Sequence, residues 1–132
     1  MKYLLDTCVW IWWNINPPRL TPGVLDLLGT PNRYEELLLS AISPWEFCKL
    51  LEKGRLGVNA NPPDWIMEAL EMPKLRLHPI TPGISYSSTT LPPPFHDDPA
   101  DRIIVATARA CQAMVITPDD RIRGYPHVRT LW

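Results

Sequence analysis

The residues of this 132-residue chain best suited to chemistry are five acids, each placed where an expected strand ends or an expected helix begins. In a mainly parallel sheet, the carboxyl ends of the strands and the N-termini of the following helices meet at one edge. Side chains that lie far apart in the sequence can therefore converge there on one site. The five acids are Asp6, Glu46, Asp98, Asp101 and Asp119.

Such a cluster has an electrostatic cost that predicts its chemistry. Two carboxylates 4 Å apart repel each other by about 4 kcal/mol at an effective dielectric constant of about 20. A helix N-terminus offsets only about 0.3–1 kcal/mol of this. Either some of the acids keep their protons, or cations occupy the site. Carboxylate oxygens suit Mg²⁺ or Mn²⁺ rather than zinc or copper, and such an ion can polarise a phosphoryl group and activate a water.

Each acid also has a purely structural interpretation. Glu46 would complete the capping box of its helix, and Asp98 would cap the next one. Asp101 is a first-turn acid favoured by the helix dipole, and Asp119 suits a turn. Asp6 resists this interpretation best, because it lies between two apolar runs without an obvious partner. The joint placement of the acids, rather than any one of them, favours the functional interpretation.

Short apolar runs that alternate with helix signals predict the elements that position these acids. Ser43-Pro44-Trp45-Glu46 has the pattern of a capping box, with Ser43 as the cap. Segment 81–95 is rich in Ser, Thr and Pro and is expected to be a loop with at most one helical turn. The alternation indicates crossover connections and a mainly parallel sheet covered on both faces. Strands are expected at 2–5, 37–42, 75–80, 114–117 and 128–131, and helices at 8–14, 21–28, 43–53, 64–72, 98–113 and 120–124.

Composition limits the class of protein. Hydrophobic residues make up 45% of the chain and charged residues 20%, which suffices for a core and predicts one domain over residues 1–132. The longest apolar run, 8–13, is too short to cross a bilayer, and Asp6 interrupts any signal-peptide pattern, so a soluble cytoplasmic protein is expected. The three cysteines form no metal or disulfide pattern. A net charge of −1 gives no general attraction to nucleic acid, so a polyanion must be held by a local patch or by metal ions.

Taken together, the motifs resemble those of PIN-domain nucleases. The resemblance covers the whole chain in order, and the nearest subgroup is the VapC-type toxins of bacterial and archaeal toxin–antitoxin pairs. It implies a three-layer α/β/α sandwich with a mainly parallel sheet of four to five strands. The segments that carry it are Leu4-Leu5-Asp6-Thr7, Ser43-Pro44-Trp45-Glu46, His96-Asp97-Asp98-Pro99-Ala100-Asp101-Arg102 and Val115-Ile116-Thr117-Pro118-Asp119.

The resemblance implies a divalent-metal-dependent endoribonuclease. The family's four acids fall on Asp6, Glu46, Asp101 and Asp119, which would hold Mg²⁺ or Mn²⁺, and Asp98 matches the additional acid of one subgroup. The doubled Asp119-Asp120 leaves the alignment of the fourth acid open by one residue. Residues expected near the substrate are Thr7 and Thr117, which match hydroxyl positions of the family, and Arg102, which adjoins Asp101 and could grip a phosphate.

The resemblance further implies RNA as substrate, a cognate antitoxin whose helix blocks the acids, and a homodimer, with no membrane involved. The tryptophans near the first two motifs, among them Trp45, suit such a protein contact. Three other interpretations remain open. They are a PIN-type nuclease of RNA processing, a catalytically silent binding module with the same fold, and a phosphoryl-transfer domain with Asp6 as acceptor. A neighbouring antitoxin reading frame would distinguish the toxin from an RNA-processing nuclease. The loss of an acid would support the binding module, and trapping of a phosphoaspartate would support the phosphoryl-transfer domain.

Overall fold

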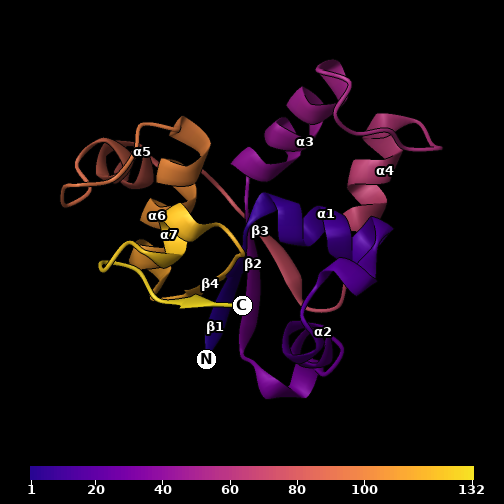
Figure 1. Ribbon diagram of the computed structural model, residues 1–132, viewed down its shortest axis with the longest axis horizontal. Coiled ribbons are helices and arrows are strands. Elements are labelled where there is room, and N and C mark those ends of the chain that lie inside the picture. The colour runs from indigo at the N-terminus through magenta and orange to yellow at the C-terminus, as the bar shows by residue number, and fades with distance from the viewer.

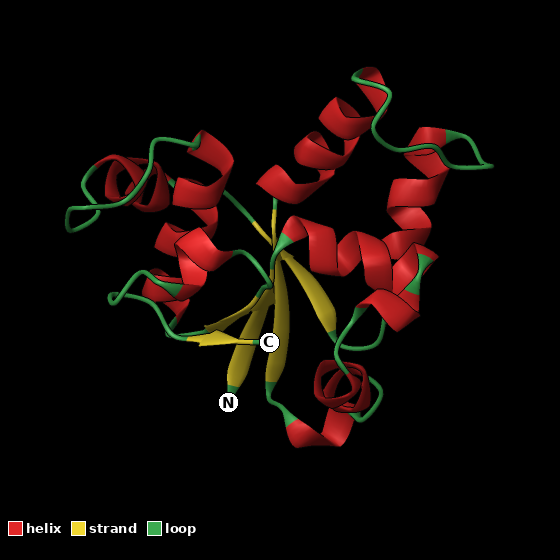
Figure 2. Ribbon diagram, in the orientation of Figure 1, coloured by secondary structure: helices red, strands yellow, loops and turns green.

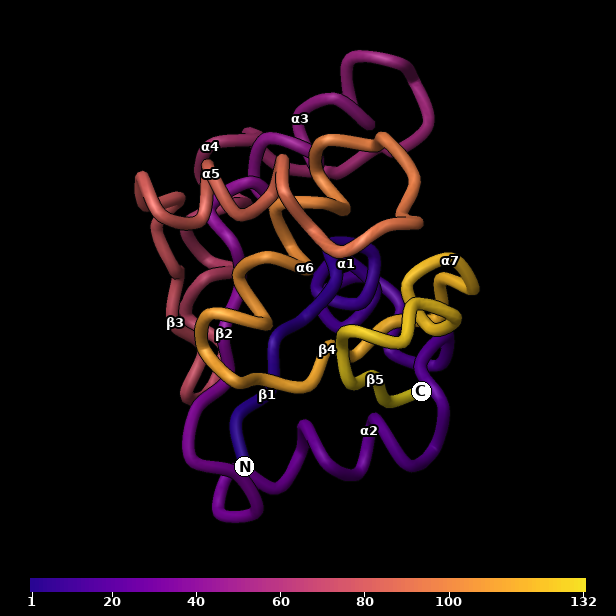
Figure 3. The backbone as a smooth tube through the Cα atoms, turned by 90° about the vertical axis from the view of Figure 1, so that its left-hand side faces the viewer, coloured from indigo at the N-terminus to yellow at the C-terminus, as the bar shows by residue number.

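A five-stranded, fully parallel sheet forms the centre of the computed structural model, which describes residues 1–132 (Figures 1 and 2). Its strand order is β3-β2-β1-β4-β5, and the five strands lie in that sequence across the view of Figure 3. All four strand pairs are parallel, so every carboxyl end points to the same edge. The strands are β1 (Lys2–Leu5), β2 (Glu36–Ser40), β3 (Leu75–His78), β4 (Met114–Ile116) and β5 (Thr130–Leu131).

Helices cover both faces of the sheet and give the three layers expected from the sequence. In Figure 1, α1, α2 and α4 lie on one side of the sheet, and α5, α6 and α7 on the other. Two short 3₁₀ turns, Pro17–Arg19 and Pro31–Arg33, flank α2. None of the helices combines the length and apolar character needed to cross a membrane. The helices are α1 (Thr7–Ile15), α2 (Pro22–Leu28), α3 (Ile42–Glu52), α4 (Pro62–Ala69), α5 (Pro82–Thr89), α6 (Pro99–Cys111) and α7 (Asp120–Arg123).

Two apolar cores hold the layers together, one on each face of the sheet. Successive side chains of a strand point to opposite faces. Leu5 accordingly packs into the core beneath α1 and α2, whereas Leu4 packs into the core beneath α6. Both are fully buried. Strands buried on both faces read as continuous apolar runs, which is why the sequence predicted them.

The strand order reverses between β1 and β4, and this is the place where ligands bind in open α/β sheets. The chain proceeds from β1 outward through β2 to β3, and then returns to the other side of β1 as β4. Asp6 directly follows β1, and its backbone amide donates to the carbonyl of Ile116 at the end of β4 at 3.0 Å. The reversal therefore leaves a crevice whose first acidic residue is Asp6.

An aromatic cluster fixes α3 and α4 against α1. The rings of Phe47 and Trp65 stack at 4.2 Å with an interplanar angle of 6°, and both contact Trp10 edge-on. The indole N–H of Trp10 donates to the carbonyl of Ala69 at 2.9 Å, which satisfies the polar atom of this buried side chain. Phe47 is fully buried and adjoins Glu46 in the sequence, so this packing positions one of the candidate acids.

Two local predictions were wrong. Segment 81–95 contains the helix α5, whose cap Thr81 accepts from the amide of Ile84 at 3.1 Å. Its opening Thr-Pro-Gly repeats the start of α2, where Thr21 caps in the same way.

The second wrong prediction concerns Ser43, which is not a cap. Helix α3 begins at Ile42, whose amide donates to the hydroxyl of Ser40 at 3.1 Å. The expected strand 37–42 accordingly ends at Ser40.

We expect Phe47→Ala to lower the free energy of unfolding by about 3–5 kcal/mol, because it leaves a cavity between α1, α3 and α4. Urea denaturation measures this. Met67→Ala serves as the control, because Met67 lies on α4 with its side chain largely exposed, and it should change the free energy by no more than about 0.5 kcal/mol. Equal effects of the two substitutions would contradict the assignment of Phe47 to the core.

Candidate active site

A pocket of ≈ 410 Å³ opens at the carboxyl edge of the sheet, and all five candidate acids line it. Its walls come from the start of α1, from α3, from the start of α6 and from the loop after β4. The convergence expected from the strand and helix ends is therefore present. A second set of lining residues is basic and consists of Lys49, Lys53, Arg55 and Arg121.

Asp6 lies deepest among the five acids and is only 6% exposed. One of its oxygens accepts from the amide of Thr7 at 2.8 Å, which caps α1. The other accepts from the hydroxyl of Thr117 at 2.7 Å. Thr117 is itself fully buried, and its hydroxyl also accepts from the amide of Asp119 at 3.0 Å. This hydroxyl thus connects the acids that follow β1 and β4.

Glu46 reaches the pocket from the second turn of α3, and a pair of hydroxyls holds it there. Its carboxylate accepts a hydrogen bond from the hydroxyl of Thr7. The same hydroxyl lies 2.8 Å from that of Ser43, one turn before Glu46 on α3. Ser43 and Glu46 do not form the expected capping box. Their side chains contact Thr7 on another helix and thereby tie α3 to α1.

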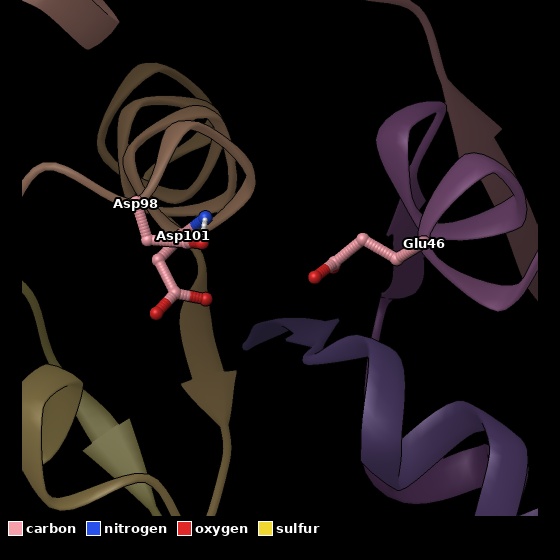
Figure 4. Close-up of side chains that lie close together, drawn as sticks. All are labelled: Glu46, Asp98 and Asp101. Carbon is pink, nitrogen blue, oxygen red and sulfur yellow. Dashed lines mark hydrogen bonds between the residues drawn. The ribbon is translucent and has the colours of Figure 1, made fainter. Parts of the chain in front are cut away.

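Asp98 and Asp101 enter the pocket together at the N-terminus of α6. Asp98 caps this helix by accepting from the amide of Asp101 at 2.9 Å. Figure 4 shows Glu46 extending from α3 toward these two side chains on α6. One carboxylate oxygen from each of Glu46, Asp98 and Asp101 lies within 4.8 Å of the other two. The structure therefore brings Asp98 into the acid cluster.

Asp119 caps α7, where it accepts from the amide of Arg121 at 2.8 Å. The guanidinium of Arg121 lies 3.3 Å from a carboxylate oxygen of Asp119 and 3.4 Å from one of Asp101. The neighbouring Asp120 has a side chain 98% exposed and pairs at 3.9 Å with Arg123. Of the two adjacent acids, Asp119 is the one that faces the pocket.

Burial and mutual repulsion shift the pKa values of these acids. Burial raises the pKa of Asp6. Burial, followed by the charges of Asp6 and Asp98, raises the pKa of Glu46 to about 7 despite its hydrogen bond from Thr7. Burial and the charges of the neighbouring acids raise the pKa of Asp101 to about 8. Without a cation, the cluster therefore holds protons at neutral pH.

Asp119 behaves differently because of its basic neighbour. Burial acts to raise its pKa, but the hydrogen bonds and the charge of Arg121 outweigh burial and leave the pKa below its usual value. Arg121 is thus the one cationic side chain placed directly among the acids, where it neutralises part of their charge.

The donor set fits a hard divalent cation. Three oxygens within 4.8 Å of one another, from Glu46, Asp98 and Asp101, could ligate one ion directly or through water. The remaining acids of the pocket, Asp6 and Asp119, add negative charge around that position. Since no nitrogen or sulfur ligand belongs to this set, the site suits an ion that prefers oxygen. An entering cation would also offset the burial and the repulsion that raise the pKa values of these acids.

Two residues that were expected near the substrate, Thr117 and Arg102, do not line the pocket. Thr117 lies beneath the pocket rather than on its wall. The guanidinium of Arg102 donates to the carbonyls of Ser88, Phe95 and His96 at 2.7, 3.1 and 3.1 Å, and it does not line the pocket. These bonds fix the loop before α6 to α5. Thr7, by contrast, does line the pocket.

Sequence reasoning missed the basic side of the pocket. Lysines one turn apart, such as Lys49 and Lys53, are typical of a solvated helix face, and a basic group near a C-terminus, such as the one that contains Arg121, is typical of an exposed surface. The only available signal was the spacing of Lys49 from Glu46, which places both on neighbouring positions of one helix surface. Nothing in the sequence around Arg121 indicates that its guanidinium turns back toward Asp101.

Fold and site define an α/β protein with an acidic pocket at the switch point of a parallel sheet. Residues 3–128 match the family model described as "PIN domain". The sequence is also 34% identical over 131 residues to "Ribonuclease VapC22" of Mycobacterium tuberculosis, covering 98% of this chain and 97% of that protein. The chain belongs to the PIN-domain family.

Solved structures agree with this fold. A chain of VapBC2 from Rickettsia felis, solved bound to a promoter DNA fragment, superposes with a TM-score of 0.69 at 15% identity, with 99% and 98% of the two chains covered. A chain of a toxin–antitoxin complex from Klebsiella pneumoniae gives a TM-score of 0.66 at 18% identity, with 98% and 96% covered. At these identities the likeness concerns the fold. PIN nucleases generally use a divalent metal, which agrees with the acidic cluster.

The pKa values predict how stability depends on pH when metal is absent. The ordinary pKa values are 3.8 for Asp101 and 4.5 for Glu46, and the folded values are about 8 and about 7. At pH values between the ordinary and the folded pKa, the folded chain keeps protons on these two groups that the unfolded chain releases. The contribution of these two groups to the free energy of unfolding therefore falls as pH rises from about 4 to about 8.

Urea denaturation in EDTA at several pH values measures this decline, and Asp101→Asn should flatten it. Asp64→Asn is the matched control, because Asp64 is an exposed acid on α4 outside the pocket, and it should keep the wild-type slope. The opposite pattern, an unchanged slope in Asp101→Asn, would contradict the raised pKa of Asp101.

Proposed function

We propose that this protein is a divalent-metal-dependent endoribonuclease, the toxin of a VapC-type toxin–antitoxin pair. The observation that carries the proposal is the convergence of five acids on one pocket at the switch point of a PIN-domain fold. The identity of 34% to a protein named as a ribonuclease supports RNA as the substrate. Residues 1–132 would act as one nuclease unit, because both the first and the last strand belong to the same sheet.

In this proposal Asp6, Glu46, Asp101 and Asp119 are the catalytic acids. Glu46, Asp98 and Asp101 hold a divalent ion, with Asp6 and Asp119 completing its surroundings. When bound, the ion polarises the scissile phosphate and lowers the pKa of the attacking water. Because the ligands are carboxylate oxygens, Mg²⁺ or Mn²⁺ is the expected ion.

The chain's own residues supply the positioning. Thr7 and Thr117 hold the carboxylates of Glu46 and Asp6 in fixed orientations, so these side chains lose little conformational freedom when the substrate arrives. Lys49, Lys53 and Arg55 line the pocket on its α3 side. From there they can bind backbone phosphates of an RNA strand whose scissile phosphate lies at the acids.

A cognate antitoxin is the expected protein partner. Structural neighbours solved as VapBC or toxin–antitoxin complexes support this. Trp45 lines the pocket and is 55% exposed, and Met67 on α4 is 64% exposed. Of these two, Trp45 is the one at the pocket, where a large apolar side chain left in solvent suits a protein contact beside the active site. The expected homodimer stays a prediction, which light scattering of the purified chain tests.

We expect the purified chain to cleave single-stranded RNA with Mg²⁺ or Mn²⁺ and to lose this activity in excess EDTA. Asp6→Asn should reduce the cleavage rate by about a hundredfold or more, since altering even the outer partners of metal ligands typically costs about 10- to 100-fold. Gel electrophoresis of labelled RNA measures the rate.

The control for this experiment is Asp64→Asn, which makes the same chemical change outside the pocket and should cleave at the wild-type rate. Circular dichroism confirms that both variants are folded. Cleavage that persists in EDTA, or that survives Asp6→Asn, would overturn the metal-dependent mechanism. If a folded, metal-loaded chain cleaves nothing in a broad RNA pool, a binding module becomes the better interpretation.

The toxin role is tested separately from the chemistry. An antitoxin should be encoded beside this gene, and its product should bind the chain and stop RNA cleavage. A cleaving enzyme without such a neighbour, and without effect on growth when expressed, would instead be an RNA-processing nuclease.

A further inference from the structure

A smaller hollow, of ≈ 210 Å³, adjoins the acidic pocket. We call it the aromatic hollow. Arg121 lines both the acidic pocket and the aromatic hollow, so the two are contiguous. The other residues that line the aromatic hollow are Pro94, Phe95, His96, Gly124 and Tyr125.

Three rings form a continuous aromatic wall in this hollow. The ring centroid of Phe95 lies 4.4 Å from that of His96 and 4.6 Å from that of Tyr125, with interplanar angles of 41° and 46°. Phe95 and His96 are half-buried residues that line the hollow, and the side chain of His96 is 21% exposed. Tyr125 is buried, and its hydroxyl donates to the carbonyl of Pro92 at 2.7 Å. Its contribution to the wall is therefore apolar.

The wall is held rigidly. Arg102 donates to the carbonyls of both Phe95 and His96 and also to that of Ser88 on α5. Phe95 additionally packs against the core beneath α6. An aromatic surface fixed in this way binds a flat ligand with little loss of conformational entropy.

The aromatic wall lies directly beside the acids. Nε2 of His96 is 3.1 Å from a carboxylate oxygen of Asp101, and the guanidinium of Arg121 is 3.4 Å from the same carboxylate. A phosphodiester at the acids would therefore place the neighbouring nucleotide at the hollow. Arg121 would lie between the two, where a guanidinium can bind a phosphate.

We propose that the aromatic hollow is a nucleobase subsite, which stacks the base of a nucleotide next to the scissile phosphate on Phe95 and His96. This inference rests on the proposed ribonuclease function and adds to it a site of substrate recognition. Aromatic side chains bind single-stranded RNA by stacking with unpaired bases. The volume is below the roughly 300 Å³ at which ordinary ligand pockets begin, which suits one planar base.

The test uses a single-stranded oligoribonucleotide that the wild-type protein cleaves at one position. A set of its derivatives lacks one base at a time near that position. Binding is measured by fluorescence anisotropy in EDTA, so that no RNA is cleaved. We expect one base-free derivative to bind about tenfold more weakly than the intact strand, since stacking of one base on an aromatic side chain contributes about this much.

The decisive comparison is made with Phe95→Leu, which keeps an apolar side chain in the core but removes the ring. This variant should bind the intact strand about tenfold more weakly, and it should no longer distinguish the base-free derivative. Phe95→Trp should restore the distinction. Tyr86→Leu is the matched control, because Tyr86 is an aromatic residue on α5 that is 71% exposed and lies outside the hollow, and it should behave as wild type.

The outcomes separate the two proposals. If the wild-type protein cleaves RNA but every base-free derivative binds equally well, the subsite is overturned while the nuclease function stands. The same holds if Phe95→Leu still distinguishes the derivatives. If the wild-type protein cleaves no RNA, both proposals fail. His96→Leu provides a second variant should Phe95→Leu not fold, and it should reduce the same distinction.

Discussion

The repulsion among carboxylates at one edge of a parallel sheet is the constraint on which the rest of this structure depends. Five acids line one pocket, where burial first and then their mutual repulsion raise the pKa of Glu46 to about 7 and the pKa of Asp101 to about 8. A chain free to relax would move these groups apart into water. They stay together because each follows a strand or lies on a helix that is packed into an apolar core. Holding the acids together thus lowers the free energy of unfolding, and a cation that binds the folded site would raise it again.

The same carboxylates cap helices and line the pocket, so a structural role of an acid does not exclude a chemical one. The sequence predicted a cap for Asp98 and a first-turn position for Asp101, and both are correct, whereas Asp6 caps a helix although the sequence offered no structural role for it. Asp6, Asp98 and Asp119 each accept a hydrogen bond from a backbone amide at a helix start. A carboxylate has about four acceptor positions on its two oxygens, however, so a cap leaves acceptor capacity for other partners. Capping fixes the side chain, and a fixed side chain is what a metal site needs.

Features that depend on local sequence patterns could be predicted, whereas features that depend on contacts between distant residues could not. Buried strands produce apolar runs, so the sheet and the acids at its edge could be predicted. Ser43 looked like a cap because a capping box is a local pattern, yet its hydroxyl meets Thr7, which lies 36 positions earlier in the chain. The helix α5 was missed although Thr81-Pro82-Gly83 repeats the start of α2, because the Ser, Thr and Pro content of the segment outweighed that signal. The position of Arg121 depends on how α7 packs beside α6, which no local pattern encodes.

The charge of the pocket connects metal binding with RNA binding. The whole chain has a net charge of −1 and cannot attract a polyanion in general. The pocket is lined by five acids and four basic residues, so its formal charge is also slightly negative when all five acids are ionised, as a bound cation would require. One divalent cation reverses that sign. Because Lys49, Lys53 and Arg55 lie on the α3 side and four of the five acids lie on the other walls, the reversal occurs where a scissile phosphate would bind, between the basic wall and the aromatic hollow. The ion would therefore strengthen RNA binding, so the metal would contribute to substrate binding as well as to cleavage.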